Sequence, residues 1–371
     1  MENPSKQNLN IESSDSHPGV EIPNLEERFN NYFKSNSPVR DLLGNLLNGV
    51  GFSKHSNGQI WLVGTFKEGI PHGLFNLYNR NGKFRWQRTY SNGEMEGPFE
   101  IYYQNGQLEQ KGTIRNGKRD GAFESYNEYG QLREKGTYKE GKEDGLFELY
   151  NSIKKLIRKR NYKNGTLDGP CEDYYDNGKL EWKRTYKDGK LYGLSIKYYK
   201  SGRYYHEESK LREKATYVDD NIDGLFESYY ENRKLEKEVI YKGGKFDGSF
   251  KIYYENGQLR EKQTYNNDEK EGPFEKYYKN GQLEQKGTIR NGEFDGKIES
   301  YYEYGQLMVK GNYTNGEKDG PFEEYFENGQ LREKGTHKDG EKEGQWEGYF
   351  GDGSVDRSRT GVFRNGVKIS D

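Results

Sequence analysis

A glycine recurs along this chain at a nearly constant spacing, usually after an acidic residue and two positions before an aromatic one. The twelve occurrences are Gly73, Gly97, Gly121, Gly145, Gly169, Gly193, Gly224, Gly248, Gly272, Gly296, Gly320 and Gly344. Ten of the eleven intervals between them are 24 residues long and one is 31. Equal intervals of this length indicate a repeated supersecondary unit, so the chain is expected to fold as an array of repeats.

The composition indicates what kind of unit is repeated. Of 371 residues, only 30% are hydrophobic and 32% are charged, which is too polar for a large aliphatic core. The chain nevertheless contains 33 Tyr, 18 Phe and 48 Gly, whereas disordered chains are poor in aromatic residues. These features together predict many short strands joined by tight turns.

The unit that begins at Gly97 reads as a β-hairpin closed at Asn105–Gly106, because both residues of an Asn-Gly pair tolerate positive φ. A two-residue turn there places Glu100 opposite Lys111 and Phe99 opposite Gly112. The same register gives opposite charges or an aromatic over a glycine in most other copies. Closer to the turn, it places Tyr102 opposite Glu109 and Tyr103 opposite Leu108.

Alternation along the strands then predicts two faces. One face carries Phe99, Tyr103 and Leu108, and the other carries Glu100, Tyr102 and Lys111. The first tyrosine of the unit is present in all twelve copies, so it is interpreted as structural. The positions assigned to the architecture of the repeat are Phe99, Tyr102, Gly112, Tyr126, Tyr150, Tyr277 and Tyr325.

The predicted fold is therefore all-β: an elongated single antiparallel β-meander of about twelve 24-residue hairpins, with a short α-helical N-terminal cap. The array is expected over 57–366, with an insertion at 203–209 that accounts for the long interval. Residues 1–22 are expected to be a disordered tail, 23–56 the helical cap and 367–371 a C-terminal tail.

Two helices are expected in the cap. Residues 37–47 begin with Ser-Pro and place Val39, Leu42, Leu43, Leu46 and Leu47 on one helical face. A second, weaker pattern starts at Asn24 with a capping-box sequence and includes Phe29 and Phe33.

The segment KGTYKEGKEDGLFELYN at 135–151 resembles the longer, bacterial-type variant of the MORN repeat. The resemblance depends on Gly136, Tyr138, Gly141, Gly145, Phe147 and Tyr150 and on their spacing. It implies an elongated β array that serves as an interaction or scaffolding module. Some members of the variant group are named as antitoxins, and some eukaryotic MORN arrays are linked to membranes or the cytoskeleton.

No catalytic or metal-binding motif emerges from the sequence. Cys171 occupies a Phe position of the repeat and reads as a small apolar filler, and the five histidines lack metal-ligand spacing. Residues 219–230 begin like a calcium loop but end in Tyr230 where a glutamate is required. We therefore expect a protein that is not an enzyme and that uses no metal and no cofactor.

Charge and the N-terminal sequence narrow the expected partners. Since 59 basic residues balance 61 acidic ones, no nucleic-acid partner is expected, although tyrosines and lysines interleave along one face. Carbohydrate binding through the tyrosine row is a comparable minor alternative. No secretory signal and no apolar run long enough to span a membrane is found, which predicts a cytoplasmic location.

The expected function is a non-catalytic protein–protein interaction module or scaffold, in its sharper form an antitoxin- or immunity-like protein that neutralises a partner protein. The alternative is a membrane- or lipid-associated scaffold. Because regular positions serve the fold, recognition is expected where the repeat is irregular. The candidate binding residues are Tyr204, Tyr205 and His206 in the insertion, Tyr229, and the like-charge pairs Glu227/Glu238 and Lys251/Lys262. The sequence leaves the partner, the binding face and the oligomeric state open.

Overall fold

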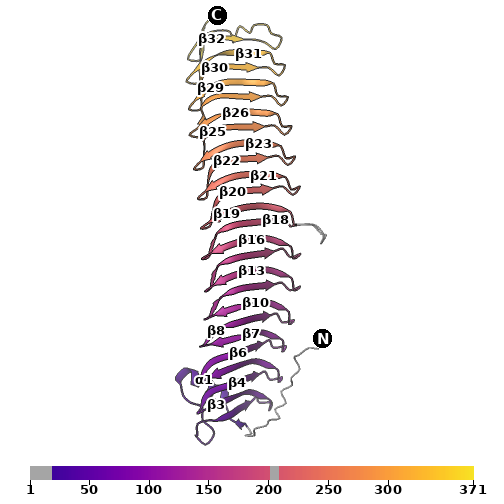
Figure 1. The fold of residues 1–371 in the computed structure, drawn as a ribbon, viewed down its shortest axis with the longest axis vertical. Coiled ribbons are helices and arrows are strands. Elements are labelled where there is room, and N and C mark those ends of the chain that lie inside the picture. The colour runs from indigo at the N-terminus through magenta and orange to yellow at the C-terminus, as the bar shows by residue number, and fades with distance from the viewer. Residues whose placement is uncertain (1–18, 201–208) are drawn as a thin grey trace. The chain divides into compact units, whose positions relative to one another are not determined.

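The computed structural model describes residues 19–200 and 209–371, which form two compact units. Apart from β1 (Val20–Glu21), which pairs parallel with β2 (Gly49–Lys54), successive hairpin strands within each unit pair antiparallel in chain order, so the predicted all-β hairpin meander is confirmed (Figure 1). One α-helix, α1 (Leu25–Ser35), lies near the N-terminus.

The first unit comprises residues up to Gly169 together with 176–178, and the second comprises 170–175 and 179–371. The first contains α1 and β1 (Val20–Glu21), β2 (Gly49–Lys54), β3 (Ile60–Lys67), β4 (Ile70–Tyr78), β5 (Phe84–Ser91), β6 (Glu94–Tyr102), β7 (Leu108–Arg115), β8 (Lys118–Arg119), β9 (Gly121–Tyr126), β10 (Leu132–Lys139), β11 (Lys142–Glu143), β12 (Gly145–Tyr150), β13 (Leu156–Lys163) and β14 (Thr166–Leu167).

The second unit contains β15 (Gly169–Tyr174, from its second residue onward), β16 (Leu180–Lys187), β17 (Lys190–Leu191), β18 (Gly193–Tyr198), β19 (Leu211–Val218), β20 (Asn221–Tyr229), β21 (Leu235–Lys242), β22 (Lys245–Tyr253), β23 (Leu259–Asn266), β24 (Glu269–Lys270), β25 (Gly272–Tyr277), β26 (Leu283–Arg290), β27 (Glu293–Phe294), β28 (Gly296–Tyr301), β29 (Leu307–Thr314), β30 (Glu317–Tyr325), β31 (Leu331–Lys338), β32 (Glu341–Gly348), β33 (Gly361–Arg364) and β34 (Val367–Ser370).

The strands extend beyond the expected limits of the array at both ends. A hairpin of β2 and β3 precedes the first predicted unit and starts at Gly49 rather than at residue 57. At the other end, residues 367–370 were expected in a tail but form β34, which pairs with β33.

The anchor glycine of each repeat adopts a backbone conformation that other residues rarely tolerate. All twelve have φ between 73° and 126°. Around Gly121, the six residues from Arg119 to Glu124 lie opposite only four residues of β7, from Ile114 to Lys111, so the chain bulges here. Positive φ at a bulge favours glycine because it has no Cβ, which explains why this residue is the most regular feature of the sequence.

The two-residue turn of the unit is not at the position predicted for it. Asn105 has no positive φ and Gly106 does, and the amide of Gly106 donates to the carbonyl of Tyr103 at 2.9 Å. This is a three-residue loop that ends in a left-handed glycine, so the predicted two-residue turn at Asn105–Gly106 is wrong. The two-residue turn lies instead at Asn116–Gly117, where both residues have positive φ and Arg115 pairs with Lys118.

The three-residue loop shifts the strand pairing by one position, and a bulge shifts it back. Tyr102 pairs with Leu108, not with Glu109, and Glu109 is the extra residue of a bulge. Beyond this bulge, Glu100 pairs with Lys111 and Phe99 with Gly112, as predicted. The prediction was wrong for Leu108, which lies on the face of Tyr102 and not on that of Phe99, because directly opposed residues share a face.

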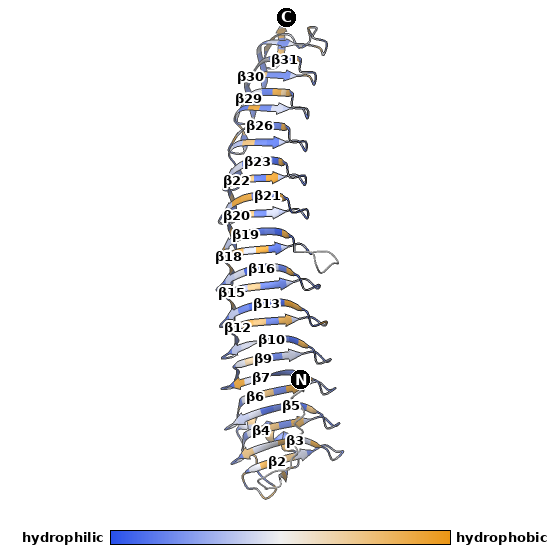
Figure 2. Ribbon diagram, turned by 45° about the vertical axis from the view of Figure 1, so that its right-hand side comes forward, coloured by the Kyte–Doolittle hydropathy of each residue, from blue (hydrophilic) through white to orange (hydrophobic). Residues whose placement is uncertain are grey.

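The buried face of the array is a ladder of aromatic rings. In the first unit, Phe123, Tyr138, Phe147 and Tyr162 follow one another edge to face at centroid distances of 5.3–5.5 Å. The tyrosines of this ladder, Tyr138 in β10 and Tyr162 in β13, do not belong to the tyrosine row on the opposite face, whose members in these hairpins are Tyr126 and Tyr150. Edge-to-face rings with this spacing stabilise the packing beyond the area that they bury. Figure 2 shows how apolar and polar positions alternate along the strands.

Residues 37–47 do not form the predicted helix. They form a turn in which Arg40 bridges to Leu46 and the Asp41 carboxylate accepts the backbone amides of Leu43, at 2.9 Å, and Asn45, at 2.8 Å. A side-chain acceptor of this kind offers the backbone an alternative to helical hydrogen bonds.

Backbone pairing with the first hairpins also opposes a helix here. The amide of Val39 donates to the carbonyl of Gly69, and the amide of Gly69 donates to the carbonyl of Leu47, each at 2.8 Å. Val39 and Leu47 are buried, whereas Leu42 and Leu43 are 65% and 86% exposed. The apolar residues whose spacing suggested one helical face therefore lie partly in the core and partly on the surface.

The weaker of the two predicted helices is the one that forms. Asn24 precedes α1 with φ of 56° and makes no side-chain capping bond, so the predicted capping box is absent. Packing stabilises the helix instead: the ring of Phe29 lies 4.9 Å from that of Phe75 and 5.7 Å from that of Tyr90. Helix α1 therefore covers the aromatic face of the first hairpins.

Candidate functional site

The predicted binding residues fall into two groups. Tyr204, Tyr205 and His206 lie in residues 201–208, outside the part of the chain that the structure describes. A row of charges in the second unit contains Glu227, Glu238, Lys251 and Lys262, and Tyr229 is the last residue of β20, on the same face as Glu227.

Each charge of this row is balanced by a neighbouring hairpin. Glu227 and Glu238 face each other, and so do Lys251 and Lys262, as the register predicted. However, Lys214 approaches Glu227 to 2.9 Å, Glu238 approaches Lys251 to 2.6 Å, and Lys262 approaches Glu275 to 3.9 Å. The like-charge pairs therefore need no external partner.

Ion pairs of the same kind connect the regular hairpins, and each forms between two consecutive hairpins rather than within one hairpin. Lys111 lies between Glu100 of its own hairpin and Glu124 of the next, and its ammonium lies 2.9 Å from Glu124. Lys135 likewise approaches Glu148 to 2.6 Å. The prediction that opposite charges meet across strands is confirmed, but the ion pairs join consecutive hairpins.

The tyrosine row also serves the fold. The Tyr150 hydroxyl donates to Glu148 at 2.7 Å, two residues earlier on the same face, and the same bond recurs in other units. Burial raises the pKa of Tyr150, and the Glu148 carboxylate raises it further. The neighbouring Lys135 lowers the pKa of Glu148. The remaining described bonds of this kind join Tyr102 to Glu100, Tyr126 to Glu124, Tyr174 to Glu172, Tyr277 to Glu275, Tyr301 to Glu299, Tyr325 to Glu323 and Tyr349 to Glu347.

The second tyrosine of the Tyr-Tyr pair has a role that sequence reasoning missed. The Tyr254 hydroxyl donates to the backbone carbonyl of Tyr277 in the next hairpin at 2.8 Å. At the hairpin tip, the Asn256 amide donates to the carbonyl of Lys279 at 2.9 Å. These hydrogen bonds connect the loops of consecutive hairpins. The other described tyrosine bonds of this kind start at Tyr103, Tyr175, Tyr199, Tyr230, Tyr278 and Tyr302.

A cleft of about 930 Å³ lies where α1 covers the first hairpins. Its apolar wall combines Leu62, Leu77, Trp86, Met95 and Ile101 with Phe33 of the helix. Phe33 is 47% exposed although it adjoins the N-terminal core. The cleft is therefore concave and combines this apolar wall with charged and polar side chains, an arrangement that ligand-binding sites commonly show.

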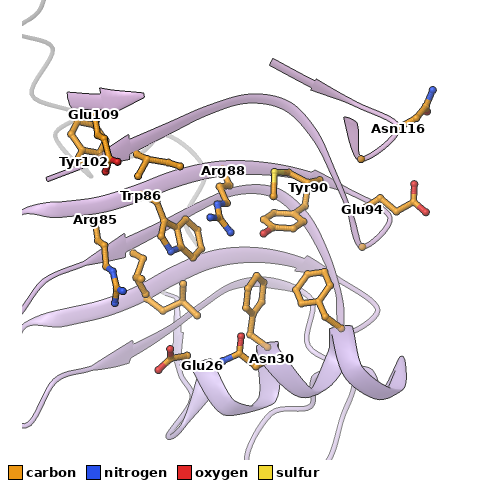
Figure 3. Close-up of a pocket in the computed structure, with 18 residues that line it drawn as sticks. Glu26, Asn30, Arg85, Trp86, Arg88, Tyr90, Glu94, Tyr102, Glu109 and Asn116 are labelled. Atoms are coloured by element: carbon orange, nitrogen blue, oxygen red, sulfur yellow. The ribbon is translucent and has the colours of Figure 1, made fainter. Parts of the chain in front are cut away.

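Two arginines of β5 line this cleft, Arg85 and Arg88 (Figure 3). Trp86, Arg88 and Tyr90 lie along the strand with their side chains directed toward α1, and Glu26 and Asn30 face them from the helix. The guanidinium of Arg88 lies 4.6 Å from the centre of the Trp86 ring. Sequence reasoning missed this site, although Arg88 stands at the position that is glycine in many other units.

Repeated matches to one family model cover much of this array. The model described as the MORN repeat variant matches eight times, at residues 95–116, 119–140, 167–188, 222–242, 246–267, 270–291, 294–315 and 318–339. The match at 119–140, for example, covers β9 and β10, which pair with each other to form one hairpin. The chain is a MORN-repeat protein. MORN repeats suggest a repeat-based binding scaffold, and the antitoxin naming of some members does not follow from this match.

Solved structures resemble the MORN array only distantly. A crystal structure titled TcdB2-TccC3-Cdc42 is 10% identical, with 87% of this chain and 22% of that chain covered and a TM-score of 0.17. One titled TcdB2-TccC3-TEV is 12% identical, with 88% and 21% covered and a TM-score of 0.16. A Photorhabdus luminescens Tc holotoxin pore is 13% identical, with 88% and 20% covered and a TM-score of 0.16. The chain thus spans about a fifth of these chains, and no curated protein matches it.

Two further properties concern the described part of the MORN array. None of its helices has the length and apolar character needed to cross a membrane. No group of three or more His, Cys, Asp or Glu side chains in the described ranges is arranged to hold a metal ion.

Proposed function

We propose that this MORN array is a non-catalytic scaffold that binds a protein partner in the cleft beneath α1. The observation that carries the proposal is the cleft itself. It joins an apolar wall to two arginines and retains an aromatic side chain, Phe33, that is 47% exposed. Interfaces between proteins favour aromatic and arginine side chains at their centres.

The rest of the repeat supports placing recognition at this end. The carboxylates of the charged row accept tyrosine hydroxyls or pair with lysines, as Glu148 does with Tyr150 and Lys135. Because these carboxylates make the same contacts in successive hairpins, we assign them to the stability of the array rather than to recognition. A catalytic constellation would be expected at one position rather than in every unit, which is why we propose a binding role.

Site-specific photocrosslinking in the cells that naturally express the chain tests the proposed surface. A photoreactive phenylalanine analogue is placed at Phe33 in the cleft, and at Tyr129 as the control. Tyr129 lies at a hairpin tip and is 84% exposed, so it tests for non-specific capture. A discrete protein adduct at Phe33 that is absent at Tyr129 is expected. Adducts only at Tyr129, or none at either position, would contradict the proposal.

What binding does to the partner requires a separate test. Neutralisation of a toxic protein is the finer form of the proposal, and its basis is the resemblance described above. Once the partner is known, its expression alone is expected to arrest growth, and co-expression of the MORN array is expected to restore it. Growth unaffected by the partner would remove the neutralising role and leave the binding role intact.

A further inference from the structure

Arg88 occupies an unusual position on the aromatic face of the first hairpins. Phe75 of β4 and Phe99 of β6 lie directly opposite it on the two flanking strands. Trp86 and Tyr90 are its neighbours on the same face of β5. The sheet therefore surrounds this guanidinium with four aromatic side chains, and no carboxylate of the described strands forms an ion pair with it.

The corresponding arginine of another repeat has the partner that Arg88 lacks. Arg184 lies 15 residues after its anchor glycine, as Arg88 does, and each follows a tryptophan by two residues. Arg184 stacks on Trp182 at 4.9 Å and forms an ion pair with Asp173. Asp173 lies four residues after its anchor glycine, and the residue at that position in the Arg88 repeat is Leu77.

The helix does not supply the missing charge. Glu26, Glu94 and Glu109 line the cleft, yet within the described ranges neither Arg85 nor Arg88 has a carboxylate oxygen within 4.0 Å of its guanidinium. Arg88 is partly buried, so its charge is incompletely hydrated. A guanidinium in such surroundings gains most from a carboxylate that binds it in a bidentate manner.

We propose that the cleft beneath α1 recognises a peptide segment in which a carboxylate lies next to apolar side chains, with Arg88 as the anchor for the carboxylate. The carboxylate takes the place that Asp173 holds beside Arg184. The apolar side chains contact Trp86, Met95 and Ile101, which are only partly buried and line the same cleft. This inference rests on the proposed function, because it assigns the chemistry of the partner to that site.

Selection from a random heptapeptide library displayed on phage, panned against the immobilised full chain, tests this chemistry. Enrichment of peptides that combine Asp or Glu with Leu, Ile or Phe is expected on the natural chain. Synthetic versions of the enriched peptides are expected to bind at least tenfold more weakly when each Asp or Glu is replaced by its amide. No enrichment, or enrichment of neutral or basic peptides, would overturn the inference.

Variants assign the effect to one side chain. Arg88→Gln is expected to abolish the enrichment of acidic peptides and to weaken the binding of the selected peptides at least tenfold. Arg88→Lys keeps the positive charge and is expected to retain part of the affinity for these peptides. Arg115→Gln, at an exposed site outside the cleft, is the matched control and is expected to change neither. Circular dichroism melting curves verify that Arg88→Gln folds. Equal acidic selection on natural and Arg88→Gln chains would overturn the role of Arg88.

The outcome separates this inference from the proposed function. If crosslinking at Phe33 captures a partner but the selected peptides are not acidic, the binding site stands and the assigned chemistry fails. If acidic peptides depend on Arg88 but no cellular protein crosslinks at Phe33, the cleft binds such peptides and the proposed scaffold role fails.

Discussion

Glu238 and Lys251 form an ion pair in which each residue stands at the position that the opposite charge holds in regular hairpins. Elsewhere a lysine of one hairpin pairs with a glutamate of the next, as Lys111 does with Glu124. The exchange of both charges together preserves the contact between hairpins and produces like-charge neighbours on either side. Pairing between consecutive hairpins, rather than within one, is therefore the contact that the array maintains.

Exchanging these two charges is expected to stabilise the array. In Glu238→Lys/Lys251→Glu the row alternates in sign without interruption from Glu227 to Lys262, so both like-charge contacts disappear. We expect a gain of about 0.5–1 kcal/mol in unfolding free energy, with each single variant close to neutral. The matched exchange Lys111→Glu/Glu124→Lys creates two like-charge contacts and is expected to lose a similar amount. Denaturant unfolding in low salt measures both, and equal effects of the two exchanges would contradict the interpretation.

Removing one hydroxyl should weaken the contact between two hairpin loops. Tyr254→Phe loses the bond to the carbonyl of Tyr277 and is expected to cost about 0.5–1.5 kcal/mol. Tyr304→Phe is the control, because Tyr304 is 86% exposed at a hairpin tip. Thermal melting of both variants distinguishes them, and equal melting temperatures would show that the Tyr254 bond contributes nothing.

The C-terminal hairpins should lose stability as pH falls below about 6.5. His337 occupies a tyrosine position of the aromatic ladder, between Phe322 and Trp346. Burial lowers its pKa from 6.5, and the charges of Lys318 and Lys342 lower it further. Because the unfolded chain then binds the proton more readily, stability is full above pH 6.5 and declines below it.

His337→Tyr restores the usual residue of the ladder and is expected to remove this dependence on pH. Hydrogen exchange of β31 and β32 between pH 5 and 8 measures it, after correction for the intrinsic pH dependence of exchange. A natural chain as protected at pH 5.5 as at pH 7.5 would contradict the assignment.

Glu299 should contribute stability that is lost only in strong acid. Hydrogen bonds from Lys297, Lys286 and Tyr301 lower its pKa from 4.5 to about 2. Its contribution is therefore complete above pH 4.5 and disappears as pH falls toward 2. Glu299→Gln is expected to be less stable than the natural chain at pH 6, with the difference shrinking toward pH 2. A difference that does not change with pH would exclude the ion pairs as its cause.

The attachment of α1 should depend on one ring more than on its neighbour. Phe29 is buried against Phe75 and Tyr90, whereas Phe33 is 47% exposed. Phe29→Ala is expected to cost about 3 kcal/mol of local stability, and Phe33→Ala much less. Limited proteolysis between α1 and β2 measures this. Equal susceptibility of the two variants would show that Phe29 does not hold the helix.

The sequence by itself determined the hairpin repeat, its strands and the pairing of Glu100 with Lys111. That register was correct because two local errors cancelled: the loop at Asn105–Gly106 has three residues, and the bulge at Glu109 restores the missing position. An Asn-Gly pair suits both kinds of turn, so local propensity cannot choose between them. The strand pairing on either side decides.

Only the tertiary structure decided which contacts join one hairpin to the next and what covers the first of them. Lys111 has a glutamate on each side, and spacing within one unit cannot say which it approaches. The apolar pattern at 37–47 favoured a helix, but backbone bonds to Gly69 outweighed it, and α1 formed through the burial of Phe29. The absence, among the described residues, of a carboxylate beside Arg88 appears only when the flanking strands β4 and β6 and the helix α1 are placed around it, because charge balance is a property of space rather than of sequence.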